Sequence, residues 1–134
     1  MAGYSGTPLL KKLGIKAGMK VAIINPPEDL PKELSNIPKV KIAAKPMKDM
    51  DFILYFTESK KEFEKNFPKF GAAFVSNGML WIGWPKKSSK MPTDLNENII
   101  RDFGLVNGLV DVKVCAIDEK WSGLKFVIRL KDRK

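Results

Sequence analysis

The sequence contains no histidine and a single cysteine, Cys115, among its 134 residues. An internal disulfide is therefore excluded, and so are the common structural zinc sites, because those sites need several cysteine or histidine ligands. The usual general base near neutral pH is missing too, as are serine–histidine and cysteine–histidine nucleophile pairs. Catalysis would have to use aspartate, glutamate, lysine, tyrosine or Cys115. We expect no metal site, and we expect Cys115 to be an inert core thiol, since apolar residues flank it.

Arginine is also scarce, although the chain is strongly basic. Only Arg101, Arg129 and Arg133 are arginines among 24 basic residues, and the formal net charge is +9. This charge favours anionic partners, which include anionic small molecules, acidic proteins and nucleic acid. Specific readers of bases and phosphates tend to use the bidentate arginine side chain. Nucleic acid is therefore the least favoured of the three partners.

Long hydrophobic runs are absent. No apolar stretch approaches the roughly 20 residues of a membrane-spanning helix, and "MAGYSGTPLL" lacks the basic region and long apolar stretch of a secretory signal. A composition of 44% hydrophobic and 29% charged residues suits a soluble globular protein. We therefore expect one domain over residues 1–134, a cytoplasmic location and no membrane partner.

Apolar runs that suit strands alternate with helical patterns along the chain. The strands that we expect are 20–25, 39–44, 50–57, 78–85, 110–118 and 123–130, the fourth of them starting after an Asn77-Gly78 turn. Helices are expected after the cap Thr7-Pro8, within "EDLPKELS" and after the capping boxes that open at Ser59 and Asp94. Pro68 is expected to interrupt or restart the third of these helices.

This alternation predicts an α/β fold, a three-layer Rossmann-like sandwich with a mostly parallel sheet of about six strands. The last two strands are joined by a link so short that they should form an antiparallel hairpin. The link "KPMKDM" between the second and third strands is too short for a helical crossover. Either a bare loop crosses over there or the second strand runs antiparallel, and we expect the bare loop.

The stretch "LLKKLGIKAGMKVAIIN", residues 9–25, resembles the leader of class I S-adenosylmethionine-dependent methyltransferases, and the order of the later strands resembles theirs. In that family a glycine-rich loop then lets backbone N–H groups approach the cofactor. Here Asn25 is followed by Pro26 and Pro27, which have no backbone N–H. The family's acidic ribose-binding residue is replaced by the run 43–45, "AAK". The resemblance thus implies a degenerate methyltransferase-like fold with no working cofactor loop, and we expect no cofactor.

Three longer stretches carry a second resemblance. They are "GYSGTPLLKKLGI", "WPKKSS" with "PTDL", and "GLVDVKVCAIDEKWSGLKFVIR". Together they resemble a family of short bacterial proteins that form a domain of unknown function. This resemblance covers nearly the whole chain and implies no particular activity.

The expected site lies outside the carboxyl ends of the parallel strands, where open α/β sheets bind ligands. The residues that we expect there are Tyr4, Ser5, Thr7, Asn25, Thr57, Trp84, Lys86, Lys87, Ser88, Asp118, Trp121 and Ser122. Lysines, hydroxyls and free N–H groups at a helix start suit a phosphate or carboxylate. Purely structural interpretations also stay open. "PKKSSK" suits a solvated loop, "YSGTP" suits a helix cap, and Trp121 suits an aromatic lid on the core.

Three functions fit these residues. The leading hypothesis is a non-catalytic module that binds a ligand or partner at an anion-friendly edge. An alternative is an enzyme acting on a phosphorylated or nucleotide-like substrate, with Asp118 or Glu119 as base and Lys86 or Lys87 neutralising charge. A basic nucleic-acid-associated protein is the third. The catalytic residues are unknown.

Overall fold

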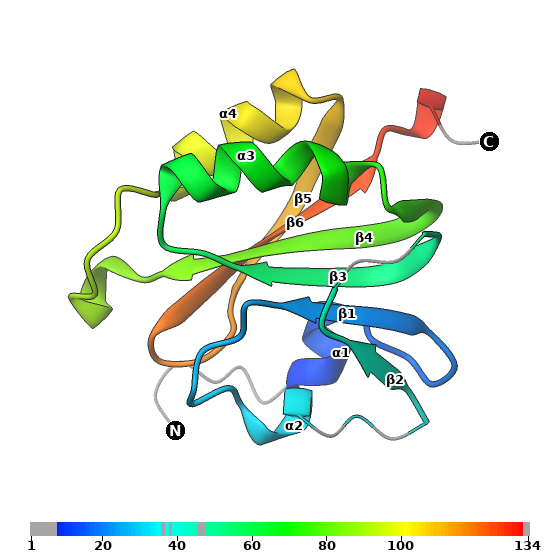
Figure 1. Ribbon diagram of the computed structural model, residues 1–134, viewed down its shortest axis with the longest axis horizontal. Coiled ribbons are helices and arrows are strands. Elements are labelled where there is room, and N and C mark those ends of the chain that lie inside the picture. Colours follow the sequence, from blue (N-terminus) through cyan, green and yellow to red (C-terminus); the bar gives the residue numbers. More distant parts are fainter. Residues whose placement is uncertain (1–7, 36, 38, 46–47, 133–134) are drawn as a thin grey trace.

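The computed structural model describes residues 8–35, 37, 39–45 and 48–132, which form a six-stranded sheet between two helical layers (Figure 1). The strands are β1 (Lys20–Ile24), β2 (Lys41–Ala43), β3 (Met50–Phe56), β4 (Phe74–Pro85), β5 (Leu109–Ala116) and β6 (Trp121–Ile128). The helices are α1 (Leu9–Leu13), α2 (Lys32–Ser35), α3 (Lys60–Gly71) and α4 (Glu97–Val106), and two short 3₁₀ turns occupy Lys87–Ser89 and Leu130–Asp132.

The strand order is β2-β1-β3-β4-β6-β5. β1 pairs in parallel with both β2 and β3, and β3 pairs in parallel with β4. β6 runs antiparallel to both β4 and β5. The predicted α/β fold, with a mostly parallel sheet and a closing antiparallel hairpin, is confirmed. β2 is parallel to β1, so the antiparallel alternative for the second strand is wrong and the parallel direction that goes with the preferred bare loop is confirmed.

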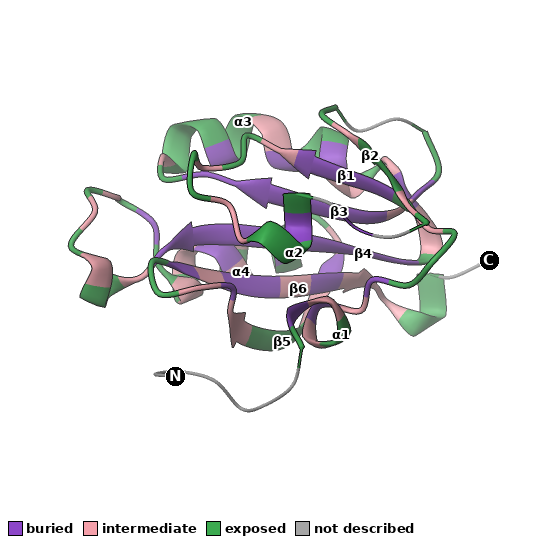
Figure 2. Ribbon diagram, turned by 90° about the horizontal axis from the view of Figure 1, so that it is seen from below, coloured by how far each residue is buried: buried purple, intermediate pink, exposed green. Residues whose placement is uncertain are grey.

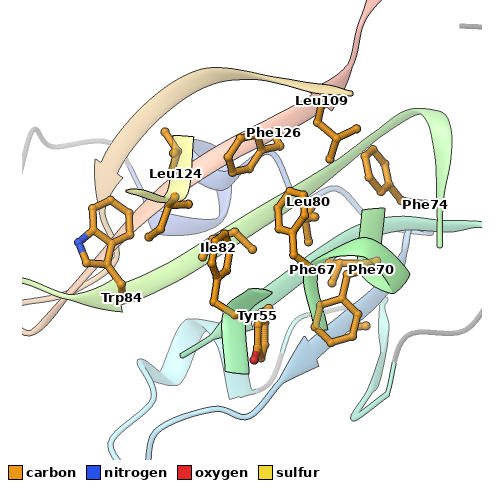
Figure 3. Packing of buried hydrophobic residues seen from close by; sticks show 14 of the residues in the cluster. Tyr55, Phe67, Phe70, Phe74, Leu80, Ile82, Trp84, Leu109, Leu124 and Phe126 are labelled. Carbon is orange, nitrogen blue, oxygen red and sulfur yellow. The ribbon is translucent and has the colours of Figure 1, made fainter. Parts of the chain in front are cut away.

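Apolar side chains cover both faces of the central strands. On one face, Phe63 and Phe67 of α3 and Ile100 of α4 pack against Leu80 and Phe126 (Figure 3). Strands enclosed in this way read as continuous apolar runs in the sequence, which is why β3 and the second half of β4 are recognisable from the sequence.

The opposite face is covered by α1 and α2 (Figure 2). Leu13 of α1 and Leu34 of α2 are fully buried there, against a cluster that includes Phe52 and Trp81. The Trp81 indole donates from Nε1 to the Leu13 carbonyl oxygen (2.9 Å), so the end of α1 is fixed to β4 by a buried hydrogen bond. Gly14 follows with φ of 92°, the left-handed end expected for this helix.

Helix α3 begins at its predicted capping box and passes through Pro68 without a break. The Ser59 hydroxyl accepts the Glu62 N–H (3.2 Å), and the helix continues to Gly71. The expected interruption at Pro68 is wrong. Phe67 and Phe70 on either side of it are buried, so packing of this face holds the last turn although proline donates no hydrogen bond there.

Asn77-Gly78 is not a turn before β4; it lies inside the strand. The pairing register of β4 with β3 shifts between Phe74 and Met79, so the four residues between them form an irregular, bulged stretch. A Cβ on Gly78 would lie 2.9 Å from the Asp51 carbonyl oxygen. Glycine is therefore needed here because two backbones approach each other closely. An Asn-Gly pair suits such a bulge as well as a turn.

The expectation that Asp94 caps the last helix is wrong. Asn96 caps α4 by accepting the Ile99 N–H (2.9 Å). The Asp94 carboxylate instead accepts the Lys60 N–H (2.7 Å), so it caps α3 from the neighbouring loop. The predicted Thr7-Pro8 cap involves Thr7, which lies outside the described residues; α1 begins directly after Pro8.

We predict that Gly104→Ala lowers the free energy of unfolding by about 2 kcal/mol or more, because the new methyl group overpacks the interface between α4 and β6. A Cβ at this position would lie 2.1 Å from a ring carbon of Phe126. Gly71→Ala is the matched control, since its Cβ would lie at an ordinary 3.5 Å from Leu109. Alanine suits a helix better than glycine, so urea unfolding of this control should show unchanged stability or a gain of up to about 1 kcal/mol. Equal stability of the two variants would contradict the prediction.

Candidate functional site at the carboxyl edge of the sheet

The strand order reverses between β1 and β3. The chain leaves β1 toward β2 on one side, whereas β3 pairs with the other side of β1. In open α/β sheets, ligands bind in the crevice outside the carboxyl ends of the strands at such a switch point. The residues that follow β1 and β3 therefore decide what this crevice accepts.

Asn25 closes the switch point with its own side chain. Its amide donates from Nδ2 to the Phe56 carbonyl oxygen (3.0 Å), one step beyond the last paired residues, Ile24 and Tyr55. The backbone of Asn25 is left-handed (φ 55°), a conformation that asparagine tolerates better than most residues. Pro26 and Pro27 follow without N–H donors. A side-chain bridge between two strands thus stands at the carboxyl end of β1.

Thr57 follows β3 and is buried, with 3% of its surface exposed. Its N–H donates to the Gly83 carbonyl oxygen (2.9 Å), which extends the ladder between β3 and β4. Its hydroxyl lies 3.4 Å from both the N and the O of the Ser59 backbone. Thr57 therefore shapes the turn into α3.

The hairpin turn between β5 and β6 joins this edge from the other side. Asp118 accepts the N–H groups of Lys120 and Trp121 on one carboxylate oxygen (2.8 Å each), so it holds the turn. The Lys86 N–H donates to the Lys120 carbonyl oxygen (2.8 Å), which ties the turn to the end of β4. Trp121 and Ser122, which the sequence places in the turn, are the first two residues of β6.

An exposed ion pair connects the turn to the loop after β1. The Lys120 ammonium group lies 2.7 Å from a carboxylate oxygen of Asp29. This hydrogen bond lowers the pKa of Asp29 and raises the pKa of Lys120. Both groups are therefore charged across the neutral range, and the link is lost in acid as Asp29 becomes protonated.

Trp121 lies beneath the bridge, on the face covered by α1 and α2. Its indole packs edge-on against Phe56, with ring centroids 5.1 Å apart, and only 5% of its surface is exposed. The indole N–H is buried and has no hydrogen-bond partner among the described residues. A buried donor without a partner costs about 1–3 kcal/mol, so this atom calls for an explanation. Trp84 packs into the core of the opposite face (Figure 3), whereas Trp121 belongs to the core under α1 and α2.

The loop after β4 projects from the body of the molecule (Figure 1). Lys87 and Ser88 are exposed in its 3₁₀ turn, and Lys86 is partly buried at the base. The Ser89 hydroxyl donates to the Lys86 carbonyl oxygen (2.6 Å) and accepts the Met91 N–H (3.2 Å). This loop thus has internal hydrogen bonds, and its lysine ammonium groups face solvent.

Side chains occupy part of each neighbouring helix start. Ser59 and Asp94 accept N–H groups at the start of α3, and Asn96 accepts one at the start of α4. Asp94 places a carboxylate where an anion would otherwise bind at α3. The lysines of the loop after β4 are therefore better placed than the start of α3 to attract an anion at this edge.

The structure brings most of the predicted residues to one edge but gives several of them structural roles. Asn25, Thr57 and Asp118 hold backbone groups, Trp84 and Trp121 are core residues, and Lys86, Lys87 and Ser88 belong to the projecting loop. Tyr4, Ser5 and Thr7 lie outside the described residues. Sequence reasoning missed Asp29, whose acidic neighbourhood in "PPEDL" gives no hint of its contact with Lys120.

Two further observations concern metals and membranes. The described part of the chain contains no group of three or more potential metal-ligating side chains. Among the same residues, no helix has both the length and the apolar character needed to cross a bilayer.

Comparison with known proteins supports the fold. No protein-family model matches the chain, and no curated protein matches its sequence. Solved structures of methyltransferases do match. An S-adenosylmethionine-dependent methyltransferase from Aquifex aeolicus has a TM-score of 0.62 and 16% identity, over 90% of this chain and 88% of its own.

Two others are a TehB-like methyltransferase from Corynebacterium glutamicum and a magnesium protoporphyrin IX methyltransferase from Synechocystis solved with bound S-adenosylmethionine. The first has a TM-score of 0.58 and 11% identity, over 90% of this chain and 85% of its own. The second has a TM-score of 0.61 and 10% identity, over 90% of this chain and 74% of its own. Identities this low show a shared methyltransferase-like fold.

We predict that Asn25→Asp lowers the free energy of unfolding at neutral pH by about 1 kcal/mol, because an ionised carboxylate cannot donate to the Phe56 carbonyl oxygen. Aspartate also tolerates the left-handed backbone, so the change isolates the hydrogen bond. Once protonated, the introduced carboxyl group can donate again, so the difference from the unchanged protein should shrink in acid. Urea unfolding across the acidic range measures this, and a deficit independent of pH would contradict the prediction.

We also predict that Cys115 reacts slowly with iodoacetamide at neutral pH in the folded protein. Burial raises the pKa of this thiol, while Lys12 and Lys113 oppose the shift. The reactive thiolate should therefore form at higher pH than in the urea-unfolded chain, which serves as the control. Rates of alkylation measured against pH should give a higher midpoint for the folded protein, and coincident midpoints would refute this.

Proposed function

We propose that this protein is a binding module with a methyltransferase-like fold, which binds a small organic anion at the carboxyl edge and does not transfer methyl groups from S-adenosylmethionine. The observation that carries the proposal is the Asn25 bridge to Phe56 at the switch point. A cofactor in that crevice needs backbone N–H groups that approach it closely. This chain supplies a side-chain bridge and two prolines instead.

Non-catalytic binding is supported by the roles of the polar groups at this edge. Asp118 is a candidate base by sequence, but one of its carboxylate oxygens holds two backbone N–H groups of the hairpin turn. The hydroxyls of Thr57 and Ser89 likewise contact nearby backbone. Groups with these roles are poorly placed to transfer protons, because a general base must reach a substrate proton.

The proposed anionic character of the ligand follows from the polar groups at this edge that are not engaged by other described residues. Within the described part of the chain, Lys86 and Lys87 make no ion pair. The buried Trp121 N–H at the same edge has no acceptor among the residues that the structure describes. A ligand with a carboxylate or phosphate for the lysines, and an acceptor for the indole, would use all three groups.

The proposal includes two expectations from the sequence. The chain is proposed to represent a family of short bacterial proteins marked by "WPKKSS" and "VDVKVCAIDEKWSGL". Its location is proposed to be the cytoplasm, as the default for a chain with this composition.

Thermal-shift and calorimetric titrations with S-adenosylmethionine, S-adenosylhomocysteine, nucleotides and phosphorylated metabolites test the proposal. We predict no binding of S-adenosylmethionine, and a raised melting temperature with one class of anionic metabolite. A ligand present at 100 times its Kd stabilises the folded state by about 2.7 kcal/mol. Lys86→Gln with Lys87→Gln should weaken the hit by about tenfold, since two nearby charges are removed.

The control for charge is Lys61→Gln with Lys65→Gln, on the exposed side of α3, which should leave the affinity unchanged. Trp121→Phe should weaken only a ligand that accepts from the indole N–H, so it reports whether that donor is used. Binding of S-adenosylmethionine that produces methyl transfer would overturn the proposal. A hit that is insensitive to the Lys86 and Lys87 changes would show that the site is misplaced.

A further inference from the structure

A groove of about 590 Å³ lies at the opposite end of the strands from the carboxyl edge. It is lined by the first residues of β1, β2 and β3 and by the segments that lead into them. We call it the amino-edge groove and define it by Gly18, Met19, Lys20, Val21, Lys39, Lys41, Ile42, Ala43, Lys48 and Met50. Its volume is within the range of about 300–1,000 Å³ that is usual for small-molecule sites.

Among the described residues, no helix stands between β2 and β3 to cover the groove. Helices α3 and α4 pack over β4, β5 and β6, while β2 lies at the far end of the sheet (Figure 1). Apolar side chains at this end are therefore left without a helical cover. Ile42 is 37% exposed, which makes it one of the exposed large apolar residues of the described chain.

The groove floor is apolar. Met19 and Ala43 are partly buried and Ile42 is 37% exposed, so these side chains offer the apolar surface, whereas Val21 and Met50 are buried in the cores of the two faces of the sheet. Methionine side chains adapt to ligands of irregular shape. A floor of this kind contributes binding energy only to a molecule with an apolar body that enters the groove.

The groove rim is cationic. Lys20, Lys39, Lys41 and Lys48 are all exposed, and none of them makes an ion pair with another described residue. Asp51 lies next to the rim, but its carboxylate accepts the Lys20 backbone N–H (2.8 Å). The exposed Asp49 is the other acidic residue of this segment, so lysines outnumber acids at the rim.

Two of the rim lysines are forced together by the register. Lys20 and Lys41 are direct partners across the β1–β2 pair, and like charges at such positions are destabilising. Lysine on an edge strand prevents pairing with other chains, which accounts for Lys41 on β2. It does not account for Lys20, because β1 is an interior strand. An anion held between the two ammonium groups would relieve their repulsion.

We propose that the amino-edge groove binds a monomeric amphiphilic organic anion, with an apolar body on the floor of Met19, Ile42 and Ala43 and a carboxylate or phosphate head among the rim lysines. Inorganic phosphate would use the rim but not the floor, and a neutral hydrocarbon would use the floor but not the rim. A membrane surface would need large apolar side chains that protrude, whereas Met19 and Ala43 are partly buried. Only an amphiphilic anion uses both parts of the groove.

Fluorescence titration with a matched pair of probes tests this proposal. The anionic probe is 1-anilinonaphthalene-8-sulfonate, and N-phenyl-1-naphthylamine is the same aromatic body without the sulfonate. The folded protein should bind the anionic probe saturably at one site. Lys41→Gln with Lys48→Gln should weaken that probe by about tenfold, while the neutral probe changes less than about twofold, because its binding has no charge term.

Two control variants accompany this pair. Lys61→Gln with Lys65→Gln removes the same charge from the exposed side of α3 and should leave both probes unaffected. Ala43→Leu fills the groove without changing charge and should weaken both probes. Circular dichroism melting of every variant confirms that it is folded before titration, and Ala43→Leu tests the floor if the lysine variant fails to fold.

Competition distinguishes the sources of the ligand. Decanoate and decyl phosphate, each below its micelle concentration, should displace the anionic probe, whereas decanol at equal concentration and inorganic phosphate should not. Equal binding of the anionic probe to the unchanged and the Lys41→Gln, Lys48→Gln proteins would overturn the proposal. So would flotation with anionic phospholipid vesicles in the absence of displacement by decanoate, since that result indicates a membrane surface. Because Lys86→Gln and Lys87→Gln leave this groove intact, failure here is separate from failure of the carboxyl-edge site.

Discussion

β1 pairs in parallel with β2 on one side and with β3 on the other, so the chain must leave it in one direction and return beyond it. Because β1 lies between β2 and β3, the strand order reverses at the carboxyl end of β1, and Asn25 forms its bridge there. For the same reason β2 is an edge strand that pairs with the amino-terminal part of β1, and this pairing places Lys20 beside Lys41. Val21 and Ile23 hold the register, because a shift by one residue would turn both out of their core.

The carboxyl edge keeps the fold of the methyltransferases while using its polar groups internally. Asn25 bonds to Phe56, Asp118 holds the hairpin turn, and Asp94 caps α3. Each bond stabilises the folded protein, and each engages a polar group of this edge internally. An ordered edge of this kind loses little conformational freedom when a ligand binds, but it also has few donors left to offer one. The Trp121 N–H is the exception, which is why it matters to the proposed site.

Much of the architecture is predictable because a strand that is buried on both faces appears in the sequence as a continuous apolar run. The runs in β1 and β3 are nearly all apolar for that reason, and the predicted start of a helix capped by Ser59 is confirmed. Local sequence patterns fail to predict the structure where tertiary contacts determine which conformation a segment adopts. Asn77-Gly78 suits a turn and a bulge equally well, and the bulge is selected by the approach of β4 to Asp51, which no local pattern records.

The candidate sites are predictable only in part, for a related reason. The prolines after Asn25 are plain in the sequence, but the partner of Asn25 is distant in sequence, as is the partner of Asp29. The amino-edge groove gives no signal, because it depends on the absence of a helix among the described residues between β2 and β3 and on a register that places Lys20 beside Lys41. Structural need explains the polar groups at the carboxyl end of β1, since nearly all of them satisfy the backbone. It does not explain Lys20 on the interior strand β1 beside Lys41 of the edge strand β2, and interactions that oppose stability are retained most readily where they contribute to binding.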